Sequence, residues 1–322
     1  MFTESTYENA VIQLFEGMGY THIYAPEMGR EDFSDPLMDG VLRDALVRIN
    51  RGLPLEAIGE ALSKIRNFDG GSLIEKNRTF TEYLQNGVEV NYAADGETRS
   101  ALVRLVDFEK VENNKFAVVN QYTYIENGNN RRPDIILFVN GLPLVLMELK
   151  SPAKEDAGVE DAYNQLRNYI QDIPSMFIYN AICVISDLSA NRAGTITSGL
   201  DRFMDWKTKD GRYENTAYAQ FDTFYEGMFP KERLLDILKN FICFSGDAQK
   251  PIKILAGYHQ YFAVRKAVEK AVVATSTDGK GGVFWHTQGS GKSLSMVFYA
   301  HLLQEVLHSP TIVVMTDRID LD

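Results

Sequence analysis

Residues 131–152 constrain the fold of this chain more than any other stretch. The segment, RRPDIILFVNGLPLVLMELKSP, contains two apolar runs, Ile135–Val139 and Leu142–Met147, on either side of Asn140–Gly141. Asn-Gly between β-rich runs is the strongest short-range signal for a hairpin. The sequence therefore predicts two antiparallel strands joined by a tight turn.

Three charged residues stand at one end of this predicted hairpin. Asp134 opens the first strand, and Glu148 and Lys150 close the second, where side-chain alternation places them on one face. Two carboxylates with open water positions suit Mg²⁺, and a nearby lysine can activate a water or stabilise charge on a phosphate. Taken alone, so short a pattern favours an ordinary ion pair at a strand end.

A helix is predicted directly after the hairpin, over VEDAYNQLRNYIQ, and Gln165 and Tyr169 share one of its faces because they are four residues apart. Taken alone, they are a surface glutamine and a half-buried tyrosine. Together, however, Asp134, Glu148-x-Lys150 and Gln165-xxx-Tyr169 resemble the PD-(D/E)xK nucleases. The form with a Q-xxx-Y motif occurs in RecB-like nucleases and in the restriction (motor) subunit of type I restriction–modification enzymes.

This resemblance implies a fold and a chemistry. The expected fold is α/β, a PD-(D/E)xK nuclease domain with a mixed sheet flanked by helices. The expected reaction is Mg²⁺-dependent phosphodiester hydrolysis, in which Asp134 and Glu148 hold the metal and Lys150 positions or activates the attacking water. Gln165 and Tyr169 then support the site or contact DNA.

The N-terminal helix adds a candidate to this site. Residues 5–19 form an amphipathic pattern with Val11, Leu14 and Phe15 on one face. In PD-(D/E)xK enzymes such a helix often lends an extra acidic residue, and Glu8 matches that place. The alternative is a solvated glutamate favoured by the helix dipole.

The rest of the first 250 residues is expected to be structural. Helices are predicted over Asp39–Asn50, Pro54–Asn67 and Glu75–Gln85, forming a helical insert at about 31–86. Strands are predicted at Val88–Ala93, Ala101–Asp107, Phe116–Tyr124 and Phe177–Ser186. A strand and turn at Ala190–Trp206 and a helical linker at Asp222–Phe244 follow.

A second motif lies near the C-terminus. A strand is predicted at Val283–His286 and a helix at Ser293–Val306, with the loop TQGSGK between them. Such a loop wraps a phosphate with its backbone N–H groups, so the pattern predicts a P-loop for ATP. His286 stands where the general motif has its first glycine, a departure known in helicase-type loops. The expected nucleotide ligands are Gly289, Ser290, Gly291, Lys292 and Ser293.

Residues flanking this loop resemble further helicase motifs. Gln260, about 30 residues upstream, resembles the adenine-reading Q motif of superfamily 2 helicases, and glutamine can bond adenine N6 and N7. Its alternative is a polar residue at a helix start. Downstream, Thr311–Asp322 is predicted as a buried strand followed by Thr-Asp-Arg. This resembles motif Ia, in which Thr316 and Arg318 contact the DNA backbone.

The motif order predicts two domains and a linker: a nuclease domain over 1–205, a helical linker over 206–250, and the start of a RecA-like motor domain over 251–322. A complete RecA-like domain needs about 150–200 residues. No DExH box appears in the sequence. We therefore expect an N-terminal fragment that does not hydrolyse ATP by itself.

Composition narrows the class of protein. No apolar run approaches the ~18 residues of a membrane span, and the two cysteines have no metal or redox spacing, which favours a cytoplasmic protein. The net charge of −11 predicts weak, salt-sensitive DNA binding by this chain alone.

The resemblance covers essentially the whole chain and implies partners. The family cuts unmodified double-stranded DNA while translocating it with ATP, in a complex with methylase (M) and specificity (S) subunits. Two other hypotheses stay open. One is a RecB-like repair nuclease–helicase, and the other is a truncated, non-enzymatic assembly arm of the type I complex.

Overall fold

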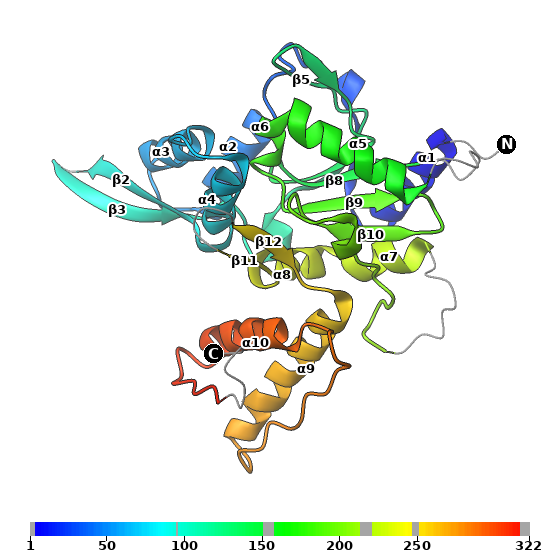
Figure 1. Cartoon of the computed structure of the whole chain (residues 1–322). Helices are drawn as coiled ribbons and strands as arrows, with labels where there is room; N and C mark the ends of the chain where they lie inside the picture. The colour runs from blue at the N-terminus through cyan, green and yellow to red at the C-terminus, as the bar shows by residue number, and fades with distance from the viewer. Residues whose placement is uncertain (1–3, 95, 151–157, 213–220, 247–250, 316–322) are drawn as a thin grey trace.

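The structure is a computed structural model, and it describes residues 4–94, 96–150, 158–212, 221–246 and 251–315. A main body surrounds a central sheet, and a pair of helices lies below it (Figure 1). The helices are α1 (Glu4–Gly17), α2 (Asp39–Ile49), α3 (Leu55–Arg66), α4 (Leu73–Asn86), α5 (Val159–Asp172), α6 (Pro174–Phe177), α7 (Phe221–Met228), α8 (Lys231–Asn240), α9 (Tyr258–Thr275) and α10 (Lys292–Val306).

Among the described residues, the sheet is mixed and has six strands in the order β1-β4-β7-β8-β9-β10. β1 is parallel to β4 and β8 is parallel to β9, whereas the other neighbours are antiparallel. Its strands are β1 (Thr21–Tyr24), β4 (Phe116–Asn120), β7 (Ile135–Val139), β8 (Leu142–Leu149), β9 (Ile182–Ser186) and β10 (Asn191–Gly194). Three two-stranded ribbons accompany it: β2–β3 (Val88–Ala94, Glu97–Val103), β5–β6 (Tyr124–Glu126, Asn129–Arg131) and β11–β12 (Ile242–Ser245, Ile252–Leu255).

The predicted hairpin is confirmed as β7–β8, at the centre of the sheet. Its turn, Asn140–Gly141, has φ values of 54° and 82°, the left-handed region that an Asn-Gly hairpin turn uses. The turn is buried. Lys115 N–H donates to Asn140 Oδ1 at 2.8 Å, and Met38 N–H donates to the Gly141 carbonyl at 3.0 Å. The hairpin is therefore fixed at its turn as well as along its strands.

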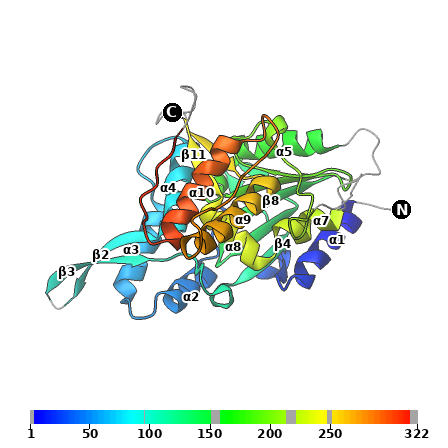
Figure 2. The same cartoon turned by 90° about the horizontal axis from the view of Figure 1, so that it is seen from below.

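Alternation along β7 divides the core into two layers. Ile136 and Phe138 pack in a cluster with Leu166 of α5, whereas Ile135 and Leu137 pack in the cluster that contains α1 and the insert helices α2–α4. In Figure 2 the strands accordingly lie between α5 on one side and α1 and α2 on the other. Because both faces are covered, β7 and β8 are buried throughout.

The structure corrects three boundaries in the sheet. β1, which we did not predict, adds a short edge strand parallel to β4. The predicted strand Phe116–Tyr124 is interrupted at Gln121, whose φ of 57° breaks the extended chain. The strand predicted from Phe177 begins only at Ile182, because Pro174 starts the short helix α6. Short apolar runs do not distinguish a buried helix turn from a strand.

Two predicted strands near the C-terminus are wrong as far as the structure describes them. Val283–His286 and residues 311–315 form no strand, and Val283 and Met315 are 96% and 90% exposed. The physical reason is the lack of a neighbour, because an apolar run becomes a strand only when another strand completes its backbone hydrogen bonds.

The β11–β12 ribbon is fastened to the main body by a buried lysine. Lys253 Nζ donates to Asn77 Oδ1 at 2.9 Å and to the Asn180 carbonyl at 2.8 Å. Burial lowers the pKa of Lys253 to about 7. This network joins the ribbon to α4 of the helical insert and to the loop before β9.

The predicted helices at the N-terminus, in the insert, after the hairpin and in the linker are all present as α1–α5, α7 and α8. Within the described residues, no helix is long and apolar enough to span a membrane.

Candidate nuclease site

The open end of the β7–β8 hairpin gathers the three predicted charges. Ile135 pairs with Met147, so Asp134 and Glu148 follow as opposed neighbours at the strand ends. Asp134 Oδ2 accepts a hydrogen bond from the Leu149 N–H at 2.7 Å, which fixes this carboxylate against β8. The sequence-predicted convergence of these side chains is therefore present in the fold.

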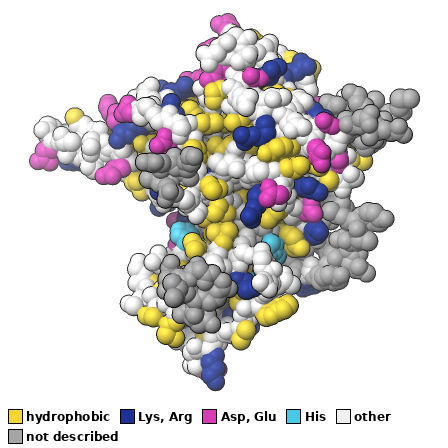
Figure 3. All heavy atoms as spheres, in the orientation of Figure 1, with side chains coloured by type: hydrophobic (Ala, Val, Ile, Leu, Met, Phe, Trp, Pro, Cys, Tyr) yellow, Lys and Arg dark blue, Asp and Glu magenta, His cyan; other side chains and the backbone are white. Residues whose placement is uncertain are grey.

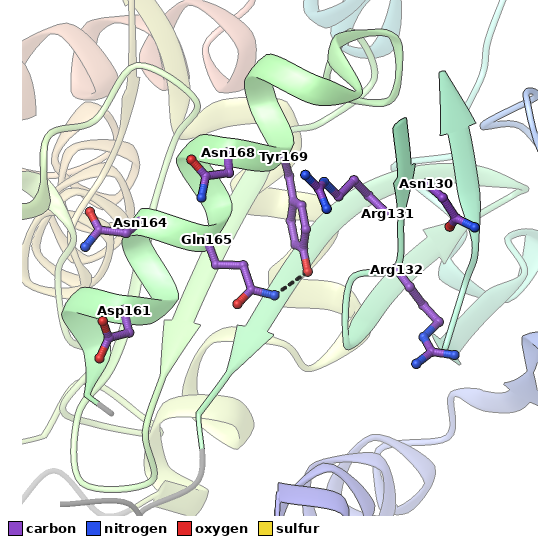
Figure 4. Close-up of a pocket in the computed structure, with 8 residues that line it drawn as sticks. All are labelled: Asn130, Arg131, Arg132, Asp161, Asn164, Gln165, Asn168 and Tyr169. Atoms are coloured by element: carbon purple, nitrogen blue, oxygen red, sulfur yellow. Dashed lines mark hydrogen bonds between the residues drawn. The ribbon is translucent and has the colours of Figure 1, made fainter. Parts of the chain in front are cut away.

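Lys150 links the hairpin to α5. Its Nζ donates to Glu148 Oε1 and to Gln165 Oε1, both at 2.7 Å. Gln165 Nε2 in turn donates to the Tyr169 hydroxyl at 2.6 Å, drawn as the dashed line in Figure 4. The two parts of the sequence pattern, Glu-x-Lys and Gln-xxx-Tyr, thus form one hydrogen-bonded chain.

Within this group, the charge of Glu148 is strongly disfavoured by burial. It is fully buried, and its Oε2 accepts no hydrogen bond of normal geometry within the described residues. Burial, and after it the charge of Asp134, raise the pKa of Glu148 to about 8, although Lys150 and the Tyr169 hydroxyl oppose this. A buried carboxylate oxygen without a partner is a site where a bound cation would be favourable.

The raised pKa predicts a pH-dependent stability difference for Glu148→Gln. Because the folded-state pKa exceeds the ordinary value of 4.5, the carboxyl group's stabilising contribution is complete below pH 4.5 and is lost as pH rises through about 8. Glutamine does not titrate. The free energy of unfolding of the variant, relative to the unmodified chain, should therefore rise between pH 5 and pH 8, by at most roughly 1.4 kcal/mol per pH unit.

Urea unfolding in EDTA at several pH values measures this difference. Glu160→Gln is the matched control, because Glu160 is an exposed carboxyl on the first turn of α5. Its difference from the unmodified chain should not change with pH. Parallel pH profiles for Glu148→Gln and the unmodified chain would show that the carboxyl is not destabilised by burial.

Glu8 of α1 lines the same cavity as Asp134. Its Oε1 accepts a hydrogen bond from Asn120 Nδ2 at 2.6 Å, and its Oε2 accepts one from Gln121 Nε2 at 3.1 Å. Asn120 Oδ1 also lies 3.0 Å from His22 Nε2. Glu8 is therefore a positioned, buried carboxylate and not the solvated glutamate of the alternative hypothesis.

Two cavities meet at this site. The first, which we call the acidic cavity, has a volume of about 630 Å³ and is lined by Ser5, Glu8, Asn9, His22, Tyr24, Asn120, Gln121, Arg132, Asp134 and Gln165. The second, the asparagine cavity, has a volume of about 410 Å³ and lies between α5 and the β6 segment (Figure 4). Its lining residues are Asn130, Arg131, Arg132, Asp161, Asn164, Gln165, Asn168 and Tyr169.

The donor set fits Mg²⁺ better than a metal held entirely by protein. Within the described residues, no three His, Cys, Asp or Glu side chains form a metal-binding group. Mg²⁺ keeps several waters and is commonly bound by one or two carboxylates together with substrate phosphate oxygens. Asp134 and Glu148, with its unpaired Oε2, fit that pattern.

The predicted P-loop lies apart from these cavities, at the start of α10. Gly289 and Gly291 have φ values of 81° and 76°, and α10 begins at Lys292, so its first N–H groups face the loop. Lys292 Nζ donates to the His286 and Thr287 carbonyls, both at 3.0 Å. The loop and the exposed Lys292 fit a phosphate ligand.

Gln260 lies beside this loop, but its amide is occupied. Its Oε1 accepts the Gly257 N–H at 2.9 Å, and its Nε2 donates to the Gly291 carbonyl at 3.0 Å. An adenine contact would require these bonds to open, so that role stays a prediction. Thr316 and Arg318 lie outside the described residues.

Sequence reasoning gave no chemical role to Asn120 and Gln121, although they belong to the same resemblance, and it did not single out Arg132. Asn120 and Gln121 hold Glu8, and Arg132 lines both cavities. The position of Arg132, two residues before Asp134, was the available signal, because alternate residues of an extended chain share a side.

The fold and the site define an α/β protein in which a mixed sheet carries two carboxylates and a lysine beside a Gln-xxx-Tyr helix, followed by a glycine-rich phosphate-type loop. Residues 1–202 match the family described as type I restriction enzyme R protein N terminus, and the chain belongs to this family. Residues 259–322 match the SWI2/SNF2 ATPase family.

Individual relatives agree with this assignment. The HindI type I restriction enzyme endonuclease subunit of Haemophilus influenzae is 40% identical, over 100% of this chain and 32% of its own length. A putative MjaIXP type I endonuclease subunit of Methanocaldococcus jannaschii is 33% identical, over 98% of this chain and 33% of its own. The chain thus spans about a third of the length of these curated relatives.

Proposed function

We propose that this chain carries the nuclease site of a type I restriction endonuclease subunit, on a PD-(D/E)xK fold, and that it cuts double-stranded DNA by Mg²⁺-dependent phosphodiester hydrolysis. One observation carries the proposal. Lys150 bonds both Glu148 and Gln165 at the end of the central hairpin, next to Asp134. Its support from comparison is that relatives over the whole chain are named as type I endonuclease subunits.

Each side chain has a distinct task in this proposal. Bound Mg²⁺ supplies a Lewis acid for the phosphate and lowers the pKa of a water. Asp134 and Glu148 hold that charge, and Lys150 donates a hydrogen bond to the water or to the phosphate oxygens. Gln165 fixes the Lys150 ammonium, and Tyr169 fixes Gln165.

The second part of the proposal concerns ATP and partners. The P-loop at Gly289–Ser293 and the SWI2/SNF2 match support ATP binding and a link to ATP-driven DNA translocation. Methylase and specificity subunits are the proposed partners, and the choice of DNA sequence lies with them. The proposed compartment is the cytoplasm. The family assignment favours this function over a RecB-like repair enzyme.

Removal of the metal is the direct test of this reaction class. In the assembled complex, with ATP and unmodified circular DNA, an excess of EDTA should abolish cutting, and added Mg²⁺ should restore it, because two carboxylates provide the charge for a divalent cation. The measurement is conversion of supercoiled DNA to nicked and linear forms. Cutting that persists in EDTA would contradict a metal-dependent site.

ATP is itself used with Mg²⁺, so the control must separate the two requirements. The nuclease step alone is tested without ATP. The substrate is then a short branched or nicked DNA fragment, which does not need to be translocated. Mg²⁺-dependence in that reaction would assign the requirement to the nuclease site.

A further inference from the structure

We infer that Arg132 binds a DNA phosphate next to the scissile one, and that Asn164 and Asn168 continue this contact along the strand. This inference rests on the proposed nuclease function and adds to it the surface that holds the substrate's backbone. We call Asn130, Arg132, Asn164 and Asn168 the polar wall. Figure 4 shows these residues around the asparagine cavity, two on α5 and two on the β6 segment opposite.

The charge of the acidic cavity favours a protein cation for the DNA backbone in addition to the proposed Mg²⁺ and Lys150. Glu8 and Asp134 both line it, and a phosphodiester brought there would be repelled by these carboxylates. Among the described residues that line the acidic cavity, Arg132 is the one lysine or arginine. The chain as a whole cannot supply the attraction, because its net charge is −11. Acidic and basic side chains are interspersed on the face seen in Figure 3.

Arg132 is available for a ligand, whereas its neighbour Arg131 is not. Arg131 is paired with Asp172 at the end of α5, with a contact of 2.6 Å from Nη2 to Oδ2. Arg132 is exposed and has no hydrogen bond or ion pair with any described residue. An unpaired guanidinium at the mouth of a cavity suits phosphate, whose oxygens it can bind in a bidentate way.

The backbone holds Arg132 in register with the catalytic carboxylate. Pro133 has a fixed φ and restricts Arg132 to extended conformations. In an extended chain, residues 132 and 134 lie on the same side. Both line the acidic cavity, as this alternation requires. The guanidinium therefore lies in the same cavity as Asp134, next to the proposed site of cutting.

The two cavities give the strand a continuous course. Arg132 and Gln165 line both, so the acidic cavity and the asparagine cavity adjoin at these side chains. Beyond them, Asn164 and Asn168 are exposed on one face of α5 and have no hydrogen bond to any described residue. Amide donors commonly contact phosphate and sugar without choosing a base. Asp161, also at this cavity, caps α5 by accepting the Gly158 N–H at 3.2 Å.

The test measures binding of a fluorescent double-stranded oligonucleotide of mixed sequence to the whole chain, with Ca²⁺, from low to moderate salt. Arg132→Ala should weaken binding about tenfold at low salt. It should also reduce the slope of log K against log salt by about 1, because one phosphate contact is lost. Arg132→Lys should keep the slope. Asn164→Ala combined with Asn168→Ala should weaken binding without changing the slope.

Arg43→Ala is the matched control, because Arg43 is exposed on α2 and lines neither cavity. If Arg132→Ala and Arg43→Ala bind alike, the inference is wrong. If the unmodified chain does not bind DNA at all, it is also wrong, since the contact belongs to this chain. Asp134→Ala separates the nuclease proposal from the Arg132 inference. It should abolish cutting, whereas the slope of log K against log salt should stay that of the unmodified chain. Cutting that survives Asp134→Ala would overturn the nuclease proposal, whatever the binding result.

Discussion

Asp134→Ala and Lys150→Ala are each expected to reduce DNA cutting by roughly 10³-fold or more in the assembled complex. Asp134 and Glu148 are the two carboxylates that the described residues place at the hairpin end, so the loss of Asp134 removes one of the two proposed ligands of Mg²⁺. Lys150 is the group that links Glu148 to Gln165, at 2.7 Å from each. Its removal leaves the buried Glu148 without its counter-charge. It also removes the ammonium group that would donate to the attacking water or to the phosphate oxygens. Conversion of supercoiled DNA to nicked and linear forms measures the loss.

Folding must be separated from chemistry in this prediction. Asp134→Ala removes one hydrogen bond to the Leu149 N–H, so thermal unfolding of each variant is measured beside its cutting. Glu160→Ala on α5 is the matched control and should cut normally, because Glu160 is exposed and lines neither cavity. Normal cutting by both Asp134→Ala and Lys150→Ala would leave the hairpin charges as a structural ion pair.

Gly141→Ala is expected to destabilise the fold by about 2–4 kcal/mol. Two costs add at this turn. Gly141 has a φ of 82°, which an L side chain adopts at a cost, and an added Cβ would lie 2.8 Å from the Met38 carbonyl oxygen and 3.0 Å from the Leu42 nitrogen. Both of these atoms are backbone at the start of α2, so they cannot move aside without shifting the helix. Urea unfolding of the purified chain measures the change.

Gly128→Ala provides a closely matched control. Asn127–Gly128 repeats the Asn-Gly turn with φ values of 49° and 82°, but no atom lies within 4 Å of a Cβ added at Gly128. This variant should show only the conformational cost, about 1–2 kcal/mol. Equal destabilisation by the two substitutions would mean that contact between the hairpin turn and α2 contributes nothing measurable.

The parts of the fold that the sequence predicted well are those that depend on local signals. Asn140–Gly141 specifies a turn by its own backbone preference, and the two apolar runs around it specify strands buried on both faces. The helix α5 has a local N-terminal cap, in which Asp161 accepts the Gly158 N–H, and a regular spacing that needs no distant partner. Asp134, Glu148 and Lys150 could be brought together in advance because the hairpin turn determines which residues face one another.

Other features depend on contacts that no local pattern records. Glu8 is held by Asn120 and Gln121, which are more than a hundred residues away in the chain. β1 is a strand only because β4 lies beside it. In contrast, Val283–His286 has the composition of a strand and forms none, because no described strand completes its hydrogen bonds.

The most direct test of the central claim measures cutting and ATP hydrolysis in the same reaction. It uses the assembled complex with an endonuclease subunit of the full length of its relatives that carries Asp134→Ala. The proposed site lies on the central hairpin, whereas the P-loop lies at the start of α10. We expect cutting of unmodified circular DNA to be lost while ATP hydrolysis continues at the rate of the unmodified complex. Cutting that continues would contradict the assignment of the nuclease to this hairpin.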